Sequence, residues 1–204
     1  MNFDPTQLDP QSCYRLLVGG IIPRPIAWIS TVSSTGVTNL APYSFFTVAS
    51  CTPPVLSVTQ VNPRNRAAKD TLANLRLNGE CVVNIVNADL AHQMNATCAD
   101  YPPEVSEFSA VGIERVSSAM VAPDSVKASP VRFECTLRQL IDVAPGASGG
   151  TLMLLDVVNI FVDDKILIDG LIAPGLLDAI GKLGGDNYAT IRERFELARP
   201  VLPR

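Results

Sequence analysis

Short runs of apolar, β-branched and aromatic residues, interrupted by proline and glycine, limit what this chain can fold into. They cover residues 23–40, 44–50, 54–61, 81–87, 131–143 and 150–167. Proline cannot occupy the interior of a hydrogen-bonded ladder, so Pro53 and Pro54 separate two strands instead of interrupting one. Along residues 26–31 the residue types alternate, with Ile26, Trp28 and Ser30 expected on one face of a strand. The pattern predicts a mainly β protein.

Helical patterns are fewer and shorter than the strand patterns. They are expected near residues 9–17, within 62–80, along 88–99, and over the tail 186–200, where Tyr188, Ile191 and Phe195 follow one stripe. In the second of these helices, Asp70 or Thr71 is expected to cap the start, and Gly79 to close the end in a left-handed conformation. Many strands with few helices predict a small β-barrel carrying peripheral helices at its rim.

Composition narrows the class of protein. At 204 residues, without a repeat or a long linker, the chain is expected to form a single domain over residues 1–204. Its net charge of -4 gives no attraction for nucleic acid. The apolar fraction of 47% favours a homo-oligomer, which would hide part of that surface.

The N-terminus, the length of the apolar runs and the metal-ligating residue types narrow the class of protein further. The acidic N-terminus, and the lack of an apolar run as long as a membrane span, favour a cytoplasmic protein with no membrane partner. Five scattered cysteines and one histidine, His92, favour neither a disulfide framework nor a metal site.

The segment around Lys69 has the chemistry of a phosphate site. The N-terminus of a helix presents free N–H groups, and Lys69 and Thr71 would add an ammonium and a hydroxyl group. Arg64 and Arg66 precede them and would add positive charge. The alternative is a solvated helix entry with no ligand, and three residues alone do not exclude it.

The octapeptide NLAPYSFF, residues 39–46, raises a similar choice. It either turns the chain into a buried strand, or holds a flat heterocycle with backbone N–H and C=O groups, helped by Asn39 or Ser44. A proline at a strand edge is compatible with both interpretations.

The ordered block formed by residues 22–59, 67–75 and 79–86 resembles the flavin reductase-like proteins with the FMN-binding split barrel, and the resemblance extends over about residues 12–190. It implies a split barrel of Greek-key type and a homodimer with FMN near the subunit interface. By position, the resemblance implies that three segments hold the flavin. The isoalloxazine ring would be bordered by Asn39, Leu40, Ala41, Pro42, Tyr43 and Ser44. Ser57 and Thr59 would lie by the ribityl chain and phosphate, and Lys69 with Thr71 would complete the phosphate site.

Other parts of the resemblance leave alternatives open. Trp28 is either a core aromatic or a residue over the flavin, and Gly184, Gly185 and Tyr188 either close over the site or belong to the dimer contact. The histidine that some family members place in the late strands near the nicotinamide is missing, which weakens a specific preference for NADH. No glycine-rich dinucleotide fingerprint follows a strand either.

The function implied is an FMN-dependent oxidoreductase that transfers reducing equivalents from a reduced donor such as NAD(P)H, through FMN, to free flavin, a partner protein or another acceptor. The cofactor would carry the chemistry, so no catalytic side chain is assigned. The alternatives are a non-enzymatic, flavoredoxin-like FMN electron carrier serving a redox partner, and a barrel that has lost its cofactor.

Overall fold

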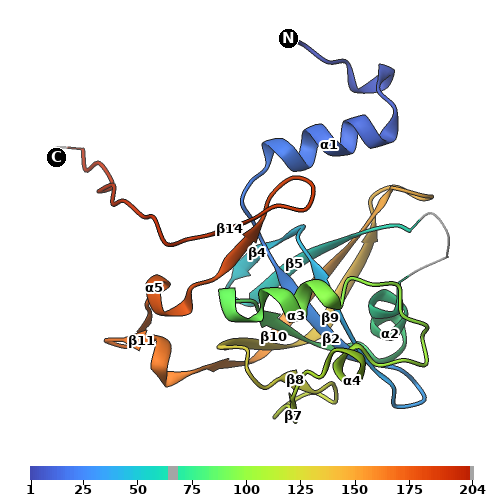
Figure 1. Ribbon diagram of the computed structural model, residues 1–204, viewed down its shortest axis with the longest axis vertical. Coiled ribbons are helices and arrows are strands. Elements are labelled where there is room, and N and C mark those ends of the chain that lie inside the picture. The colour runs from blue at the N-terminus through green and yellow to red at the C-terminus, as the bar shows by residue number, and fades with distance from the viewer. Residues whose placement is uncertain (64–68, 203–204) are drawn as a thin grey trace.

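The computed structural model describes residues 1–63 and 69–202. Its main body is one antiparallel sheet with the strand order β3-β2-β6-β9-β10-β5-β4 (Figure 1). The strands are β2 (Ala27–Val32), β3 (Thr38–Tyr43), β4 (Phe46–Cys51), β5 (Pro54–Val61), β6 (Glu80–Ile85), β9 (Val131–Asp142) and β10 (Gly150–Val162). Every predicted strand run is present, which confirms the mainly β class.

The connection between β3 and β4 makes this sheet a barrel. These strands occupy opposite edges of the sheet, yet only Ser44 and Phe45 separate them in the chain. The sheet must therefore curl until its edges meet. The carbonyl oxygen of Phe45, in this connection, accepts a hydrogen bond of 2.8 Å from the backbone N–H of Thr59 on β5, next to the β4–β5 ladder, and no β3–β4 ladder occurs within the described ranges. A curled sheet with one unpaired seam is the predicted split barrel.

The strand order also contains a crossover. β6 pairs with β2 and β9, although β5 precedes it in the chain, so the chain crosses the barrel between β5 and β6. Helix α2 (Asp70–Asn78) lies in this connection. Pairing of non-consecutive strands through a long connection is the Greek-key feature.

Both faces of β2 are buried. Ala27 and Ile29 belong to the cluster inside the barrel, whereas Trp28 belongs to a second cluster outside it, with Leu40 and Met94 among its members. The Trp28 side chain is fully buried, and its Nε1 donates a hydrogen bond of 3.0 Å to Thr97 Oγ1. The predicted alternation is confirmed, and the indole lies in the core.

The helices lie around the barrel, as expected. Besides α2, they are α1 (Pro10–Gly20), α3 (Ala91–Ala96), α4 (Glu107–Val111) and α5 (Pro174–Leu177). Short elements complete the chain: η1 (Pro5–Gln7), η2 (Ala88–Leu90), η3 (Asp164–Ile166), β1 (Arg24–Pro25), β7 (Arg115–Val116), β8 (Ser125–Val126), β11 (Leu167–Ile168), β12 (Leu171–Ile172), β13 (Ile180–Lys182) and β14 (Tyr188–Thr190). No helix in the described part of the chain is long and apolar enough to cross a bilayer.

The two ends of α2 differ in how well they match the sequence pattern. Gly79 closes the helix with a φ of 70°, the left-handed conformation predicted for it. The predicted cap at Asp70 or Thr71 is wrong. Lys69 occupies the N-cap position without a side-chain capping bond, and Asp70 and Thr71 lie inside the first turn. The buried Thr71 hydroxyl group donates its hydrogen bond to Asn39 of β3 and does not cap the helix.

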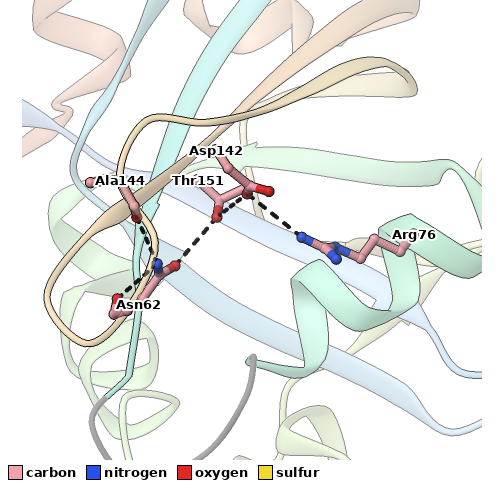
Figure 2. A network of polar contacts seen from close by, with 6 residues as sticks. Asn62, Arg76, Asp142, Ala144 and Thr151 are labelled. Carbon is pink, nitrogen blue, oxygen red and sulfur yellow. Dashed lines mark hydrogen bonds and ion pairs between the residues drawn. The ribbon is translucent and has the colours of Figure 1, made fainter.

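A polar network fixes the body of α2 and the end of β5 against the β9–β10 hairpin (Figure 2). Asn62 Nδ2 donates to the carbonyl oxygens of Ala144 and Gly146. The single hydroxyl proton of Thr151 lies between two acceptors, Asp142 Oδ1 at 3.0 Å and Asn62 Oδ1 at 3.3 Å from Oγ1. Arg76 of α2 completes the network through an ion pair of 3.7 Å with Asp142. The connection that leads to Lys69 is therefore anchored at both ends.

The predicted helix over residues 186–200 is wrong. Tyr188–Thr190 form β14, which pairs with β13, and residues 191–202 have neither helix nor strand. Figure 1 shows this C-terminal segment and α1 both projecting away from the barrel. The stripe that favoured a helix has no surface to pack on within this chain: Phe195 is 85% exposed. Without such burial, a short helix is only marginally stable in water.

Candidate functional site

Two adjoining hollows lie beside the end of β3. The first hollow is lined by Asn39, Ala41, Pro42, residues 69–71, residues 97–101 and Glu107. The second hollow is lined by Ile26, residues 42–44, Met94, Cys98, Lys182 and Tyr188. Pro42 and Cys98 line both, so together they form the wall between the hollows. The segments NLAPYSFF and KDT, which the sequence predicted to act together, open onto this one region.

The exposed edge of β3 supplies backbone groups to the site. β3 pairs with β2 only, and the N–H of Leu40 points away from β2, donating a hydrogen bond of 2.8 Å to Glu107 Oε2. In an antiparallel ladder this orientation recurs at every second residue, so the carbonyl group of Pro42 also faces the open edge. Pro42 fits there because its missing N–H is not needed for the ladder.

A buried polar cluster lies behind the first hollow. Asn39 Nδ2 donates a hydrogen bond of 2.9 Å to Glu107 Oε1, and Asn39 Oδ1 accepts bonds from Thr71 Oγ1 at 2.8 Å and Thr31 Oγ1 at 3.3 Å. Thr71 is fully buried and Asn39 is 8% exposed. These side chains join β3 to the starts of α2 and α4, so their first role is to hold the walls of the hollow in place.

The charges around the first hollow are mixed. Asp70, Asp100 and Glu107 line it together with the ammonium group of Lys69. Burial raises the pKa of Glu107 above its ordinary value, and nearby Asp70 adds to this rise, although hydrogen bonds from Leu40 and Asn39 oppose it. A raised pKa reduces the negative charge that this carboxyl group places beside the hollow. Arg64 and Arg66, the other predicted cations, lie outside the described residues.

The start of α2 is the strongest anion-binding feature of the first hollow. The first N–H groups of a helix have no intrahelical partner, and the side chain of the N-cap residue, Lys69, makes no capping bond to them. They face the hollow together with Lys69, whose Nζ lies 5.7 Å from the centroid of the Tyr43 ring. Helix N–H groups and an ammonium group beside one hollow have the chemistry that a phosphate site needs, and the binding of a phosphate by Lys69 and Thr71 stays a prediction.

The second hollow is mostly apolar and contains one cation. Lys182 Nζ lies 4.0 Å from the centroid of the Tyr188 ring, and burial lowers the pKa of this lysine. Tyr188 donates a hydrogen bond of 3.1 Å from its hydroxyl group to Asn95 Oδ1. Ser44 Oγ accepts a bond of 3.3 Å from Arg24 Nε. Tyr188 therefore lines this hollow, a position the sequence had left open.

Several predicted site residues lie elsewhere. The Leu40 side chain is buried in the outer core cluster, so only its backbone lies near the first hollow. Ser57 and Thr59 alternate with the inward-facing Leu56 and Val58 on β5, and neither lines the two hollows. Their predicted contact with a ribityl chain or phosphate group stays a prediction.

The sequence analysis missed three residues of the site: Glu107, Cys98 and Lys182. Glu107 begins α4, which is 67 positions from its partner Leu40, and no spacing rule connects the two. Cys98 is one of the scattered cysteines to which the sequence assigned no role, and it is exposed between the hollows. Lys182 lies in KLGGDNY, a segment that the sequence analysis noted for its glycines and tyrosine. The position of this lysine, two residues before the paired glycines, was the signal that could have placed it at the site.

Comparisons with known proteins agree with this architecture. The family model described as "Flavin reductase like domain" matches residues 19–178. An uncharacterized protein of Bacillus subtilis, YwrF, is 37% identical over 97% of this chain and 98% of its own length.

Solved structures are similar as well. Nitrilotriacetate monooxygenase component B from Bacillus cereus has a TM-score of 0.92 at 33% identity, covering 97% of this chain and 98% of that one. A 2-nitrobenzoate 2-nitroreductase from Pseudomonas fluorescens has a TM-score of 0.89 at 27% identity, covering 100% of this chain and 99% of that one. Flavoredoxin of Desulfovibrio vulgaris, at 18% identity and a TM-score of 0.75, shares the fold over 87% of this chain and 92% of its own.

Proposed function

This chain belongs to the flavin reductase-like family, and from that premise we propose that it is an FMN-binding oxidoreductase. It passes reducing equivalents from a reduced donor such as NAD(P)H, through bound FMN, to free flavin or another acceptor. One observation carries the proposal: the edge of β3 at Pro42 and the start of α2 at Lys69 open onto adjoining hollows with a common wall.

The residues of the two hollows fit the parts of a flavin mononucleotide. Residues 41–44 would border the ring system, because an open strand edge offers backbone groups to the polar rim of a flat heterocycle. The uncapped start of α2 and Lys69 would hold the phosphate. Asn39 and Thr71 would support these walls from behind through their mutual hydrogen bond.

The chemical step needs little from the side chains of this protein. Bound FMN supplies the two-electron chemistry. The protein would hold the ring against the β3 edge, keep the phosphate at the helix start, and limit the access of water to the apolar second hollow. Glu107 would act indirectly: its carboxylate oxygens fix Asn39 and the Leu40 N–H, and so determine where the edge of β3 lies.

The proposal includes a homodimer. Residues of α1, β1 and the start of β4, including Leu17, Ile21, Phe45 and Phe46, form an apolar groove, and Leu17 and Ile21 are more than half exposed. Ser44 lines both this groove and the second hollow. A second copy covering the groove would bury its apolar surface and border the flavin. Light scattering tests this: a mass of one chain rejects the dimer.

Titration with FMN tests the cofactor assignment. Replacing Lys69 with methionine keeps the length of the side chain and removes its charge, so the affinity for FMN should fall about tenfold, or about 1.4 kcal/mol. The fold should be unchanged, because Lys69 makes no capping bond. Lys165→Met, at an exposed position in η3, is the matched control. Equal FMN affinity in Lys69→Met and wild-type protein would reject the phosphate assignment.

Reduction of the bound flavin then separates the enzyme from the electron carrier. The enzyme should show bleaching of the flavin absorbance on addition of NADH or NADPH, followed by repeated turnover with free flavin. A flavin that is reduced by light but by neither nucleotide would favour the carrier instead.

A further inference from the structure

The second hollow, where the flavin ring would lie, is lined by charge of one sign. Among its described lining residues, one side chain carries a full charge at neutral pH, the Lys182 ammonium, and no carboxyl group is present. Burial raises the pKa of the Cys98 thiol and that of the Tyr188 hydroxyl group, so both stay uncharged at neutral pH. The ring would therefore lie beside a single positive charge that no group of this lining neutralises.

Lys182 also lacks a partner for its charge outside this lining. Its Nζ lies 4.0 Å from the centroid of the Tyr188 ring, and the described residues include no hydrogen bond or ion pair of this ammonium group. Burial and the neighbouring Arg24 lower its pKa, and Asp186 opposes them from a distance. A half-buried charge is screened less by salt and water than a solvated one, so its effect reaches a ligand in the hollow.

A second cation lies directly opposite Lys182. Arg24 and Lys182 are paired in the β1–β13 ladder. Arg24 is 6% exposed, and its guanidinium group donates from Nε to Ser44 Oγ and from Nη2 to the carbonyl oxygen of Leu183. Like charges at directly opposite positions of an antiparallel pair destabilise a fold. Folding alone therefore gives no reason for this pair, whereas an electron-rich ring beside Ser44 would be attracted by both charges.

We propose that Lys182 sets the reduction potential of the bound flavin, with Arg24 holding its strand in place and adding to its effect. The inference rests on the proposed flavin-binding function. Reduction increases the negative charge of the flavin ring, so a cation beside the ring stabilises the reduced form more than the oxidised form and raises the potential. A cation beside the phosphate group acts on both forms equally and changes the affinity alone. Lys182 would thus tune the cofactor that Lys69 holds.

The potential of the FMN-loaded protein, measured by slow reduction together with a reference dye, tests the inference without turnover. Lys182→Gln removes the charge and should weaken the preference for reduced over oxidised flavin about tenfold, which lowers the potential of this two-electron couple by about 30 mV. Lys182→Glu reverses the charge and should weaken the preference about a hundredfold. Lys182→Arg should keep the wild-type potential. Lys165→Met, at the exposed position in η3, removes one charge elsewhere and is the control.

Lys69→Met provides the contrast between the two hollows. This variant should bind oxidised and reduced FMN more weakly by the same factor, so its potential should equal that of wild-type protein. Lys182→Gln should instead lose affinity mainly for the reduced form. Titration with oxidised FMN, combined with the potential, gives the affinity for each form in each variant. A shift in potential that is as large in Lys69→Met as in Lys182→Gln would contradict the assignment of the two lysines.

Two further results would overturn the inference. One is Lys182→Gln with the wild-type potential, including the case in which this variant weakens the binding of both forms equally, because the ammonium group would then belong to the phosphate site. The other is an equal shift in Lys165→Met, which would make the effect a general one of net charge. Failure of wild-type protein to take up FMN is a different result, because it rejects the proposed function before any Lys182 variant is tested.

Discussion

In the first hollow, Asn39 is hydrogen-bonded to both Thr71 and Glu107, whereas in the second hollow the Lys182 ammonium faces an aromatic ring and no carboxylate of the described lining. Glu107 and Asn39 are both nearly buried, and each is joined to more than one partner by hydrogen bonds. The second hollow combines apolar side chains with one cation at its side.

This difference between the two hollows indicates that they have different functions. A satisfied, buried hydrogen-bond cluster holds its surroundings in one geometry, as a site for a permanently bound cofactor requires. A cation without an internal partner leaves a charge that acts on the ligand in the hollow, as the tuning of a reduction potential requires. Changes in the first hollow should therefore affect stability and cofactor affinity together, whereas changes at the Lys182 side chain should leave stability nearly unchanged.

The largest effect is expected from Glu107→Leu. This change leaves two buried donors, Asn39 Nδ2 and the Leu40 N–H, without their acceptor. At about 1–3 kcal/mol for each unsatisfied group, the free energy of unfolding should fall by about 3 kcal/mol, and FMN affinity should fall with it. Urea denaturation measures the loss, and Glu104→Leu at an exposed neighbouring position is the control. A loss below about 0.5 kcal/mol would show that the cluster does not hold the hollow together.

The pH dependence of stability should show a smaller effect of the same residue. Burial raises the pKa of Glu107 in the folded protein above the ordinary 4.5, so the folded state binds more protons than the unfolded state between these two pKa values. The contribution of Glu107 to stability should therefore fall as the pH rises above 4.5. Glu107→Gln cannot ionise and provides the reference.

Urea denaturation of both proteins between pH 4.5 and 7 checks this sign. The advantage of wild-type protein over Glu107→Gln should shrink towards neutral pH. Burial would raise the pKa of Glu134, but hydrogen bonds from Ala119, Asn159 and Met120 lower it below 4.5. Its contribution to stability is therefore lost as the pH falls below 4.5. This loss occurs equally in both proteins, so it cancels in the comparison. An advantage that grows with pH would contradict the assignment.

The smallest effect is expected in the second hollow, from Tyr188→Phe. It removes the exposed hydrogen bond to Asn95 and keeps the ring beneath the Lys182 ammonium. Stability should change by less than about 0.5 kcal/mol, and the reduction potential of the bound flavin should match that of wild-type protein. A shift of the potential in this variant as large as that in Lys182→Gln would assign the effect to the tyrosine hydroxyl group instead of the lysine.

The sequence predicted the parts of the fold that depend on neighbouring residues. The alternation around Trp28, the break at Pro53 and the closure of α2 at Gly79 are local effects of side-chain spacing and backbone conformation, and all three are present. The helix expected over residues 186–200 is wrong for a related reason. An apolar stripe predicts a helix only where a surface covers it, and residues 188–190 pair with β13 instead.

The candidate site was predicted in part. Pro42 and Lys69 do open onto adjoining hollows, as the order of their segments suggested. The pattern around Cys98 carries no such signal, and the segment of Lys182 was noted only for its glycines and tyrosine. The site is assembled from residues far apart in the chain, which a local pattern cannot predict. The hydrogen bonds of Arg24 with Ser44 and Leu183, for example, span 20 and 159 positions.

By itself, the sequence determined where strands begin and end and which of their faces are apolar, because proline, glycine and alternation act over a few residues. The tertiary structure alone decided that Glu107 accepts from the edge of β3 and that Lys182 faces the second hollow. Those contacts exist only because the sheet curls until its edges meet, and this closure depends on the packing of the whole barrel.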